Sequence, residues 1–128
     1  MNKTIVYSIR PAHKDKRGEI FDILEGDVRH TGMVTFSGKG IVRGNHYHKK
    51  STQYTYVLSG RIKLVVSPIK GGKKSEFLLK PGSFAKIPPR IIHTYKSLTK
   101  AALLDMTTES RKKSGYEQDT VRVNENNR

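Results

Sequence analysis

The sequence contains no cysteine among its 128 residues. This absence excludes a disulfide framework, a catalytic thiolate and any zinc site built from cysteine ligands. The length is that of a single domain, and a chain of this size buries roughly two thirds of the surface that its unfolded state exposes. We therefore expect one hydrophobic core that folds without covalent cross-links.

Long apolar runs are also missing. The apolar stretch near the amino terminus is too short for a signal peptide, and no later segment approaches the roughly 20 apolar residues of a membrane span. The sequence therefore predicts a soluble, cytoplasmic protein with no membrane partner.

Acidic residues are scarce, with 11 Asp and Glu against 25 Lys and Arg, which gives a net charge of +14. A charge of this size attracts anions. The basic residues occur in small scattered groups without an amphipathic helix or interleaved aromatic residues, which argues against a nucleic-acid partner. Two interpretations stay open: a surface that favours solubility, or binding of a phosphorylated or nucleotide-linked small molecule.

No part of the sequence keeps a convincing helical period, whereas short runs rich in β-branched and aromatic residues recur between Gly and Pro turns. Regularly spaced short strands of this kind indicate an all-β sandwich or barrel. We expect a barrel over residues 1–110 and a polar tail over 111–128 that is loose or docks on a partner subunit. The expected strands are residues 4–9, 19–24, 31–37, 41–48, 53–58, 61–67, 75–79, 83–87, 92–97 and 101–107.

The alternation of side chains along the strands predicts which of them face the core. Ile62 and Leu64 share one face of their strand, opposite to the charged residues between them. By the same parity His93 shares a face with Tyr95. If these faces form the barrel interior, then Gln53 and Tyr95 point inward together with the histidines.

Three of the five histidines lie in two glycine-led stretches of the chain, residues 40–60 and 82–97. His46 and His48 are separated by one residue, so on a strand their imidazoles face the same side. Neutral imidazole binds Zn, Cu, Fe and Ni, and Gln53 and His93 could complete a site with four ligands. The alternative is that these histidines are merely exposed or individually satisfied in the core.

These two stretches resemble the paired motifs of the cupin superfamily. The first resembles G-x5-H-x-H-x3,4-E-x6-G with Gln53 in place of the glutamate. The second resembles G-x5-P-x-G-x2-H-x3-N with Arg90 in place of the glycine and Ser97 in place of the asparagine. The resemblance implies a single double-stranded β-helix, the jelly-roll barrel. It also implies a divalent metal (Zn, Fe, Mn or Ni), and no nicotinamide or flavin, with the ligands His46, His48, Gln53 and His93.

The glutamine changes what such a site can hold. A carboxylate neutralises part of the charge of a divalent ion, whereas an amide offers only a neutral carbonyl oxygen. We expect weaker metal binding than in a cupin that has the glutamate.

A second resemblance indicates a particular subgroup of cupins. Residues 15–21, the string Arg-Gly-Asn-His-Tyr-His over 43–48, and residues 118–121 resemble cupins that act on nucleotide-linked deoxysugars. These are the 3,5-epimerases of 4-keto sugars, the 3,4-ketoisomerases and the C-terminal cupin domain of capsular polysaccharide epimerase-reductases. The resemblance implies a homodimeric isomerase or epimerase of a nucleotide-linked 4-keto-deoxysugar, in the biosynthesis of surface polysaccharide sugars.

Such chemistry removes a proton next to a ketone, so it needs a base, an acid and stabilisation of an enolate. By resemblance the base is His46, while His48 assists it or binds metal. Arg43 matches an arginine that contacts the sugar or its diphosphate. Arg17 is a further substrate-binding candidate, although it could equally be a turn residue.

The acid of the site is indicated by strand parity alone. Strand parity favours Tyr95, which could also be ordinary barrel lining, and Asp105 is a second polar candidate that could orient a histidine. Two other functions stay open: a metal-dependent oxygenase, and a module that binds a small molecule without turning it over.

Overall fold

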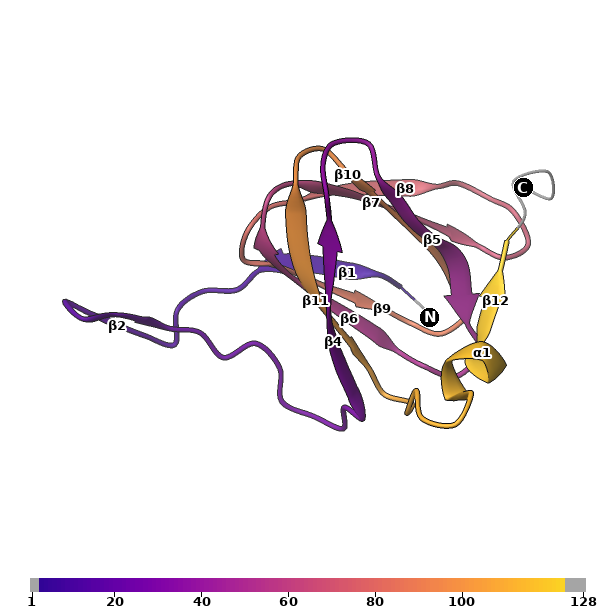
Figure 1. Cartoon of the computed structure of the whole chain (residues 1–128), viewed down its shortest axis with the longest axis horizontal. Coiled ribbons are helices and arrows are strands. Elements are labelled where there is room, and N and C mark those ends of the chain that lie inside the picture. Colours follow the sequence, from indigo (N-terminus) through magenta and orange to yellow (C-terminus); the bar gives the residue numbers. More distant parts are fainter. Residues whose placement is uncertain (1–2, 124–128) are drawn as a thin grey trace.

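Two antiparallel sheets of five strands each make up most of the protein (Figure 1). The structure is a computed structural model, and it describes residues 3–123. One sheet has the order β1 (Ile5–Ser8), β9 (Ser83–Ile87), β6 (Gln53–Ser59), β11 (Ala101–Thr107) and β4 (His30–Phe36). The other has the order β12 (Thr120–Arg122), β5 (Val42–His48), β10 (Ile91–Ser97), β7 (Ile62–Pro68) and β8 (Ser75–Leu79).

The core lies between the two sheets and confirms the predicted parity. Val57, Ile62 and Leu64 are completely buried, and the inward positions of β6 and β10 include Gln53 and Tyr95. Non-consecutive strands are neighbours in both sheets, in the order of a jelly-roll barrel. The predicted all-β fold is therefore confirmed.

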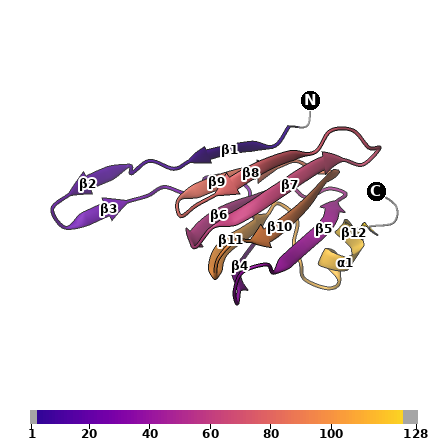
Figure 2. The same cartoon turned by 90° about the horizontal axis from the view of Figure 1, so that it is seen from above.

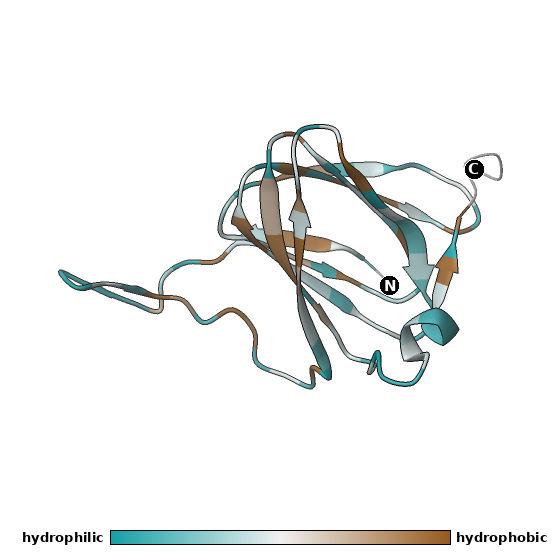
Figure 3. Ribbon diagram, viewed as in Figure 1, coloured by the Kyte–Doolittle hydropathy of each residue, from teal (hydrophilic) through white to brown (hydrophobic). Residues whose placement is uncertain are grey.

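The strand predicted over residues 19–24 is wrong. Instead β2 (His13–Asp15) and β3 (Gly18–Ile20) form a hairpin that projects from the barrel (Figures 1 and 2). The Asp15 carboxylate closes its turn by accepting hydrogen bonds from the backbone and guanidinium of Arg17. The hairpin tip is hydrophilic (Figure 3). Residues 21–24 have strand-like composition, but no neighbouring strand lies beside them to complete a ladder.

The chain beyond residue 110 also differs from the expected tail. It contains a short helix, α1 (Gly115–Asp119), and then β12, which pairs with β5 of the same chain. Five helical residues are too few to show a helical period in the sequence, and the pairing with β5 is long-range. The barrel sheet therefore extends past the predicted boundary. Docking of this segment on a partner subunit stays a prediction, and residues 124–128 lie outside the described part.

Within residues 3–123, no helix is both long and apolar enough to cross a membrane.

Candidate functional site

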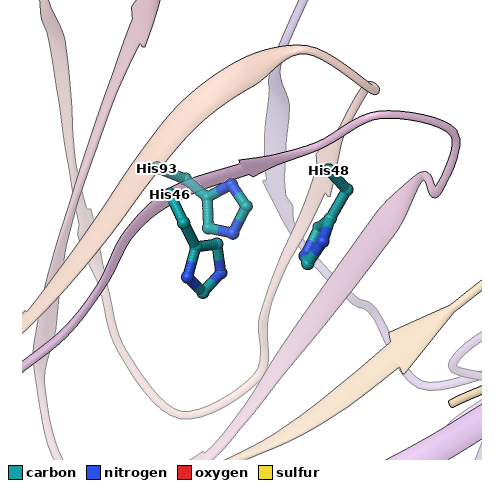
Figure 4. Close-up of side chains that lie close together, drawn as sticks. All are labelled: His46, His48 and His93. Carbon is teal, nitrogen blue, oxygen red and sulfur yellow. The ribbon is translucent and has the colours of Figure 1, made fainter. Parts of the chain in front are cut away.

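Three histidines meet inside the barrel (Figure 4). His46 and His48 come from β5, and His93 lies on the neighbouring strand β10, directly opposite His46 in the register. Their candidate ligand nitrogens lie within 4.8 Å of one another, and the His46 and His93 ring centroids are 4.7 Å apart. The structure thus brings together the three predicted histidines.

The close approach of β5 and β10 depends on a glycine. Gly44 has a φ of +95°, and a Cβ at this position would lie 2.8 Å from the His93 carbonyl oxygen. A larger residue would force the two strands apart next to the cluster. The glycine of the Arg-Gly-Asn-His string is therefore needed for β5 to pack closely against β10.

The two departures from the second cupin motif, Arg90 and Ser97, have different structural roles. Arg90 adopts a φ of +65°, a conformation that glycine reaches without strain. Ser97 is buried, and its hydroxyl donates to the Gly38 carbonyl at 2.6 Å and accepts from the Ile41 amide at 2.9 Å. Ser97 therefore ties β10 to the loop that leads into β5.

Both ring nitrogens of His48 contact protein groups. Its Nε2 lies 2.8 Å from the Gln53 side-chain oxygen, and its Nδ1 lies 3.2 Å from the Thr120 hydroxyl. The Asp119 carboxylate is 3.7 Å from the same Nδ1. Asp119 also accepts a hydrogen bond from the Lys50 amide at 2.7 Å, which anchors the end of α1 beside β5. His48 thus links the carboxyl-terminal segment to the barrel interior.

His93 is the most enclosed member of the cluster, with 1% of its surface exposed. Its Nδ1 lies 3.2 Å from the Ile91 carbonyl oxygen, so this nitrogen carries the proton and donates it. The Nε2 atom then bears a lone pair, and it is buried without a hydrogen-bond partner among the described residues. Such an orphaned acceptor is costly unless another group approaches it.

His46 is half-buried and is the histidine of the cluster that lines the neighbouring cavity. Burial lowers its pKa to about 4, and the neighbouring charges of His48, Arg122 and Arg111 add to the effect. Burial also lowers the pKa of His48 and, more strongly, that of His93. All three imidazoles are therefore neutral near pH 7, and His46 and His93 each leave a lone pair for a proton or a metal.

The cavity has a volume of about 240 Å³. Its wall combines apolar residues from β4 and β11 with polar residues from both sheets and from the carboxyl-terminal segment. It is lined by Val34, Phe36, Arg43, Gly44, His46, Gln53, Tyr95, Leu103, Asp105, Arg111 and Tyr116.

Tyr95 lies in this cavity as predicted. Its hydroxyl accepts a hydrogen bond from the Gln53 side-chain nitrogen at 2.9 Å and lies 2.5 Å from the Thr55 hydroxyl. Burial is the main cause of a raised pKa for Tyr95, and the nearby Asp105 charge adds to it. The phenol therefore stays protonated, which suits a hydrogen-bond donor better than a group that must release its proton readily.

The two predicted substrate-binding arginines occupy different places. Arg43 lines the cavity, where its Nε donates to the Thr35 carbonyl at 3.2 Å and its guanidinium lies over the Phe36 ring. Arg17 lies on the projecting hairpin, bound to Asp15 at 2.7 Å, and does not line this cavity of its own chain.

Sequence reasoning missed four residues around the cluster: Arg111, Tyr116, Asp119 and Thr120. Tyr116 lies edge-on to His46 and His48, with ring centroids 6.3 and 6.2 Å away. All four belong to the segment expected to be a tail. Only the resemblance over residues 118–121 pointed toward it, because no local signal reveals that β12 will pair with β5.

The donor set of the cluster fits a metal ion. The three imidazoles are neutral, and the His93 Nδ1–H bond to a backbone carbonyl is the usual way in which proteins orient a metal-binding histidine. The His93 Nε2 has no hydrogen-bond partner among residues 3–123, so its lone pair is free to bind an ion. Gln53 fits less well, because its side-chain oxygen already contacts His48. His46, His48 and His93 are therefore the residues that could hold a metal, and His48 would have to give up its contact with Gln53 or Thr120 to bind it.

Comparisons with known proteins place this geometry in context. A family model described as the polysaccharide biosynthesis C-terminal domain matches residues 13–121. No curated protein sequence matches the chain.

Solved structures with the same fold include a sugar 3,4-ketoisomerase from Thermoanaerobacterium thermosaccharolyticum in complex with TDP. That match has a TM-score of 0.79 and 22% identity, and covers 97% of this chain and 90% of the other. A dTDP-4-dehydrorhamnose 3,5-epimerase from Sulfolobus tokodaii has a TM-score of 0.76 and 22% identity, and the match covers 98% of this chain and 79% of the other. A 3,4-ketoisomerase from Helicobacter canadensis has a TM-score of 0.79 and 15% identity, with 96% and 92% covered.

Proposed function

Because this chain belongs to the polysaccharide biosynthesis C-terminal domain family, we propose that it is an isomerase or epimerase of a nucleotide-linked 4-keto-deoxysugar. The observation that carries the proposal is His46, a neutral imidazole that faces a cavity also lined by Arg43 and Arg111. Structures of the same fold include enzymes named for such sugars, and one of them contains TDP-4-keto-6-deoxyglucose. A cytoplasmic location is part of the same proposal.

The chemistry follows from the contacts of each residue. His46 removes a proton from the carbon next to the ketone, because the His48 nitrogens are both engaged by protein groups. Arg43 is suited to the diphosphate, since guanidinium binds phosphate through paired hydrogen bonds. Tyr95 donates a hydrogen bond to a sugar oxygen in this proposal.

Deuterium exchange tests the proposal directly. The protein is incubated in D2O with TDP-4-keto-6-deoxyglucose and its UDP counterpart, and deuterium at the ring carbons is measured by NMR. We expect the wild type to introduce deuterium and His46→Asn to introduce it about 10²–10⁴-fold more slowly. No exchange with either sugar contradicts the proposal, and a sugar that raises the Tm but is recovered unlabelled favours a binding module instead.

Metal binding is a second candidate function, favoured by the orphaned Nε2 of His93. His46, His48 and His93 would hold the ion, which would act as a Lewis acid toward a bound oxygen atom. A histidine whose lone pair binds a metal cannot use the same lone pair as a base. Elemental analysis of protein purified without added metal decides between the two uses: stoichiometric metal that is lost in His93→Ala supports the metal site.

We also propose that the protein is a homodimer that associates through the outer face of the sheet containing β1. A row of apolar side chains crosses this face, and each residue of the row is paired with the next one on the neighbouring strand. The residues at the two ends, Tyr7 and Met33, are more than half exposed. Association with a second copy would remove this apolar surface from water. The row consists of Tyr7, Phe84, Tyr56, Leu104 and Met33, of which Phe84 is already buried within the chain.

A further inference from the structure

Arg111 and Asp105 form an ion pair in the cavity, next to the histidines. Asp105 lies on β11 with its side chain buried, and Arg111 follows in the segment that leads to α1. The Arg111 Nη2 donates to the Asp105 Oδ2 at 2.8 Å. Asp105 was a candidate to orient a histidine, and its side-chain hydrogen bond goes to Arg111 instead.

The guanidinium of Arg111 is held on two sides. Besides the bond to Asp105, its central carbon lies 4.6 Å from the centroid of the Tyr116 ring. Only 25% of the Arg111 side chain is exposed. Tyr116 in turn packs edge-on against His46 and His48, so the cation and the proposed base are fixed relative to one another through a single aromatic ring.

Both partners of the pair have unused hydrogen-bonding capacity. The bond to Asp105 occupies one of several N–H donors of the guanidinium, and Arg111 lines the cavity. The other carboxylate oxygen of Asp105, Oδ1, is buried and has no partner among residues 3–123. An unsatisfied buried carboxylate oxygen is costly, so it is suited to accept a hydrogen bond from a ligand hydroxyl.

We propose that Arg111 is a catalytic residue that donates hydrogen bonds to the ketone oxygen and stabilises the enolate, while Asp105 positions Arg111 and accepts a bond from a neighbouring sugar hydroxyl. This inference rests on the proposed function. The two cavity arginines then have different roles. Arg43, which is exposed, binds the diphosphate, and the more enclosed Arg111 binds the ketone oxygen next to the reacting carbon.

The reaction balances without a further reagent. The bond between hydrogen and the carbon next to the ketone breaks, and the proton passes to His46. The electron pair of that bond forms a carbon–carbon double bond, and the carbonyl electron pair moves onto oxygen, where Arg111 stabilises the negative charge. Return of the proton to the same carbon restores the original carbonyl group. Return to the former carbonyl carbon places the carbonyl at its neighbour, and the hydroxyl proton of that neighbour then passes to the first oxygen.

Steady-state kinetics of Arg111→Met test the inference, with whichever of the two TDP- and UDP-linked 4-keto sugars the wild type labels in D2O. Loss of an oxyanion-stabilising donor lowers kcat by about 10²–10³-fold, and we expect KM to change by less than about threefold. Arg122→Met is the matched control. Arg122 also lies near the Tyr116 ring, but it is exposed and pairs with Glu117, so we expect its kcat to stay within about twofold of the wild type.

The outcomes separate the two proposals. A wild type that labels neither sugar overturns the proposed function, and this inference with it. A wild type that labels a sugar, together with unchanged kcat in Arg111→Met, overturns only the role of Arg111. A KM raised more than about tenfold at unchanged kcat also overturns it, because Arg111 would then bind the nucleotide in the ground state. If Arg111→Met does not fold, Arg111→Gln carries the same test, with folding checked by thermal melting.

Discussion

The histidines of the cluster differ in what their ring nitrogens contact. His48 has protein partners on both nitrogens, His93 on one, and His46 faces the cavity. His46 and His48 lie two positions apart on β5, yet their rings have different surroundings. We infer that His46 performs chemistry and that His48 holds the carboxyl-terminal segment against the barrel.

This division predicts opposite effects of two matched substitutions. His46→Asn should lower activity by about 10²–10⁴-fold, the usual contribution of a general base. It should destabilise the fold less than His48→Asn does, because the His46 ring faces the cavity. His48→Asn should destabilise the fold by about 1–3 kcal/mol, because Gln53 or Thr120 loses its buried partner. Urea denaturation and the D2O assay measure the two effects. Equal stability losses in both variants would refute the division.

The lowered pKa of His46 predicts how stability depends on pH. Its pKa is about 4 when folded and 6.5 when unfolded, so between these values the unfolded state binds more protons. The free energy of unfolding should therefore fall as the pH decreases from 6.5 to 4, and this contribution should be fully lost below pH 4. Urea titrations in EDTA at several pH values should show a shallower fall for His46→Asn. Parallel curves for both proteins would count against the burial of a neutral His46.

The connection between β6 and β7 depends on a glycine that no other residue can replace without displacing its neighbours. Gly60 has a φ of +78°, and an added Cβ would meet the Lys100 carbonyl oxygen and lie 2.6 Å from the Ala101 Cβ. Gly71, in the loop between β7 and β8, has a nearly equal φ of +76° but open space around it. A side chain at either position would have the same unfavourable backbone conformation. Only at Gly60 would it also collide with neighbouring atoms.

Alanine at each position should separate these two costs. We expect Gly71→Ala to lose about 1–2 kcal/mol from the left-handed backbone alone. Gly60→Ala should lose about 1–3 kcal/mol more, because the turn must shift to admit the methyl group. Chemical denaturation of both variants measures the difference. Similar losses would mean that the turn at Gly60 relaxes freely.

At the scale of the whole molecule, the apolar row on the outer face of the β1-containing sheet predicts the oligomeric state. Met33, at one end of the row, is 65% exposed, and Leu78, on the other sheet, is 74% exposed. If the proposed dimer forms, Met33→Glu should shift it toward the monomer, because a charge would be buried in an apolar contact. Leu78→Glu should leave it intact. Light scattering measures the mass, and a dimer that survives Met33→Glu would exclude this face.

Light scattering on a variant that ends at Ser110 addresses the predicted role of the tail in dimerisation. In the structure this segment already pairs with β5 of its own chain. We therefore expect its removal to lower thermal stability. An unchanged dimer would show that the segment is not needed for association.

Alternation and turn residues were sufficient to predict most of the barrel. Each predicted strand other than residues 19–24 matches an observed strand to within about two residues at either end. The hairpin over residues 13–20 was missed because its stabilising contact, Asp15 with Arg17, is a turn interaction rather than a periodic pattern. Composition identifies a segment that can form a strand, but a partner strand decides whether it does.

The spacing of His46, His48 and His93 was enough to place three imidazoles in one space, because side-chain parity along a strand is a local property of the backbone. The surroundings of each ring are not local. Contacts with Thr120, Asp119 and Tyr116 arise only when the carboxyl-terminal segment folds back onto β5, across some seventy residues of sequence. The tertiary structure alone therefore decides which histidine faces the cavity and which arginine lies beside it, since burial and contact depend on how distant segments pack.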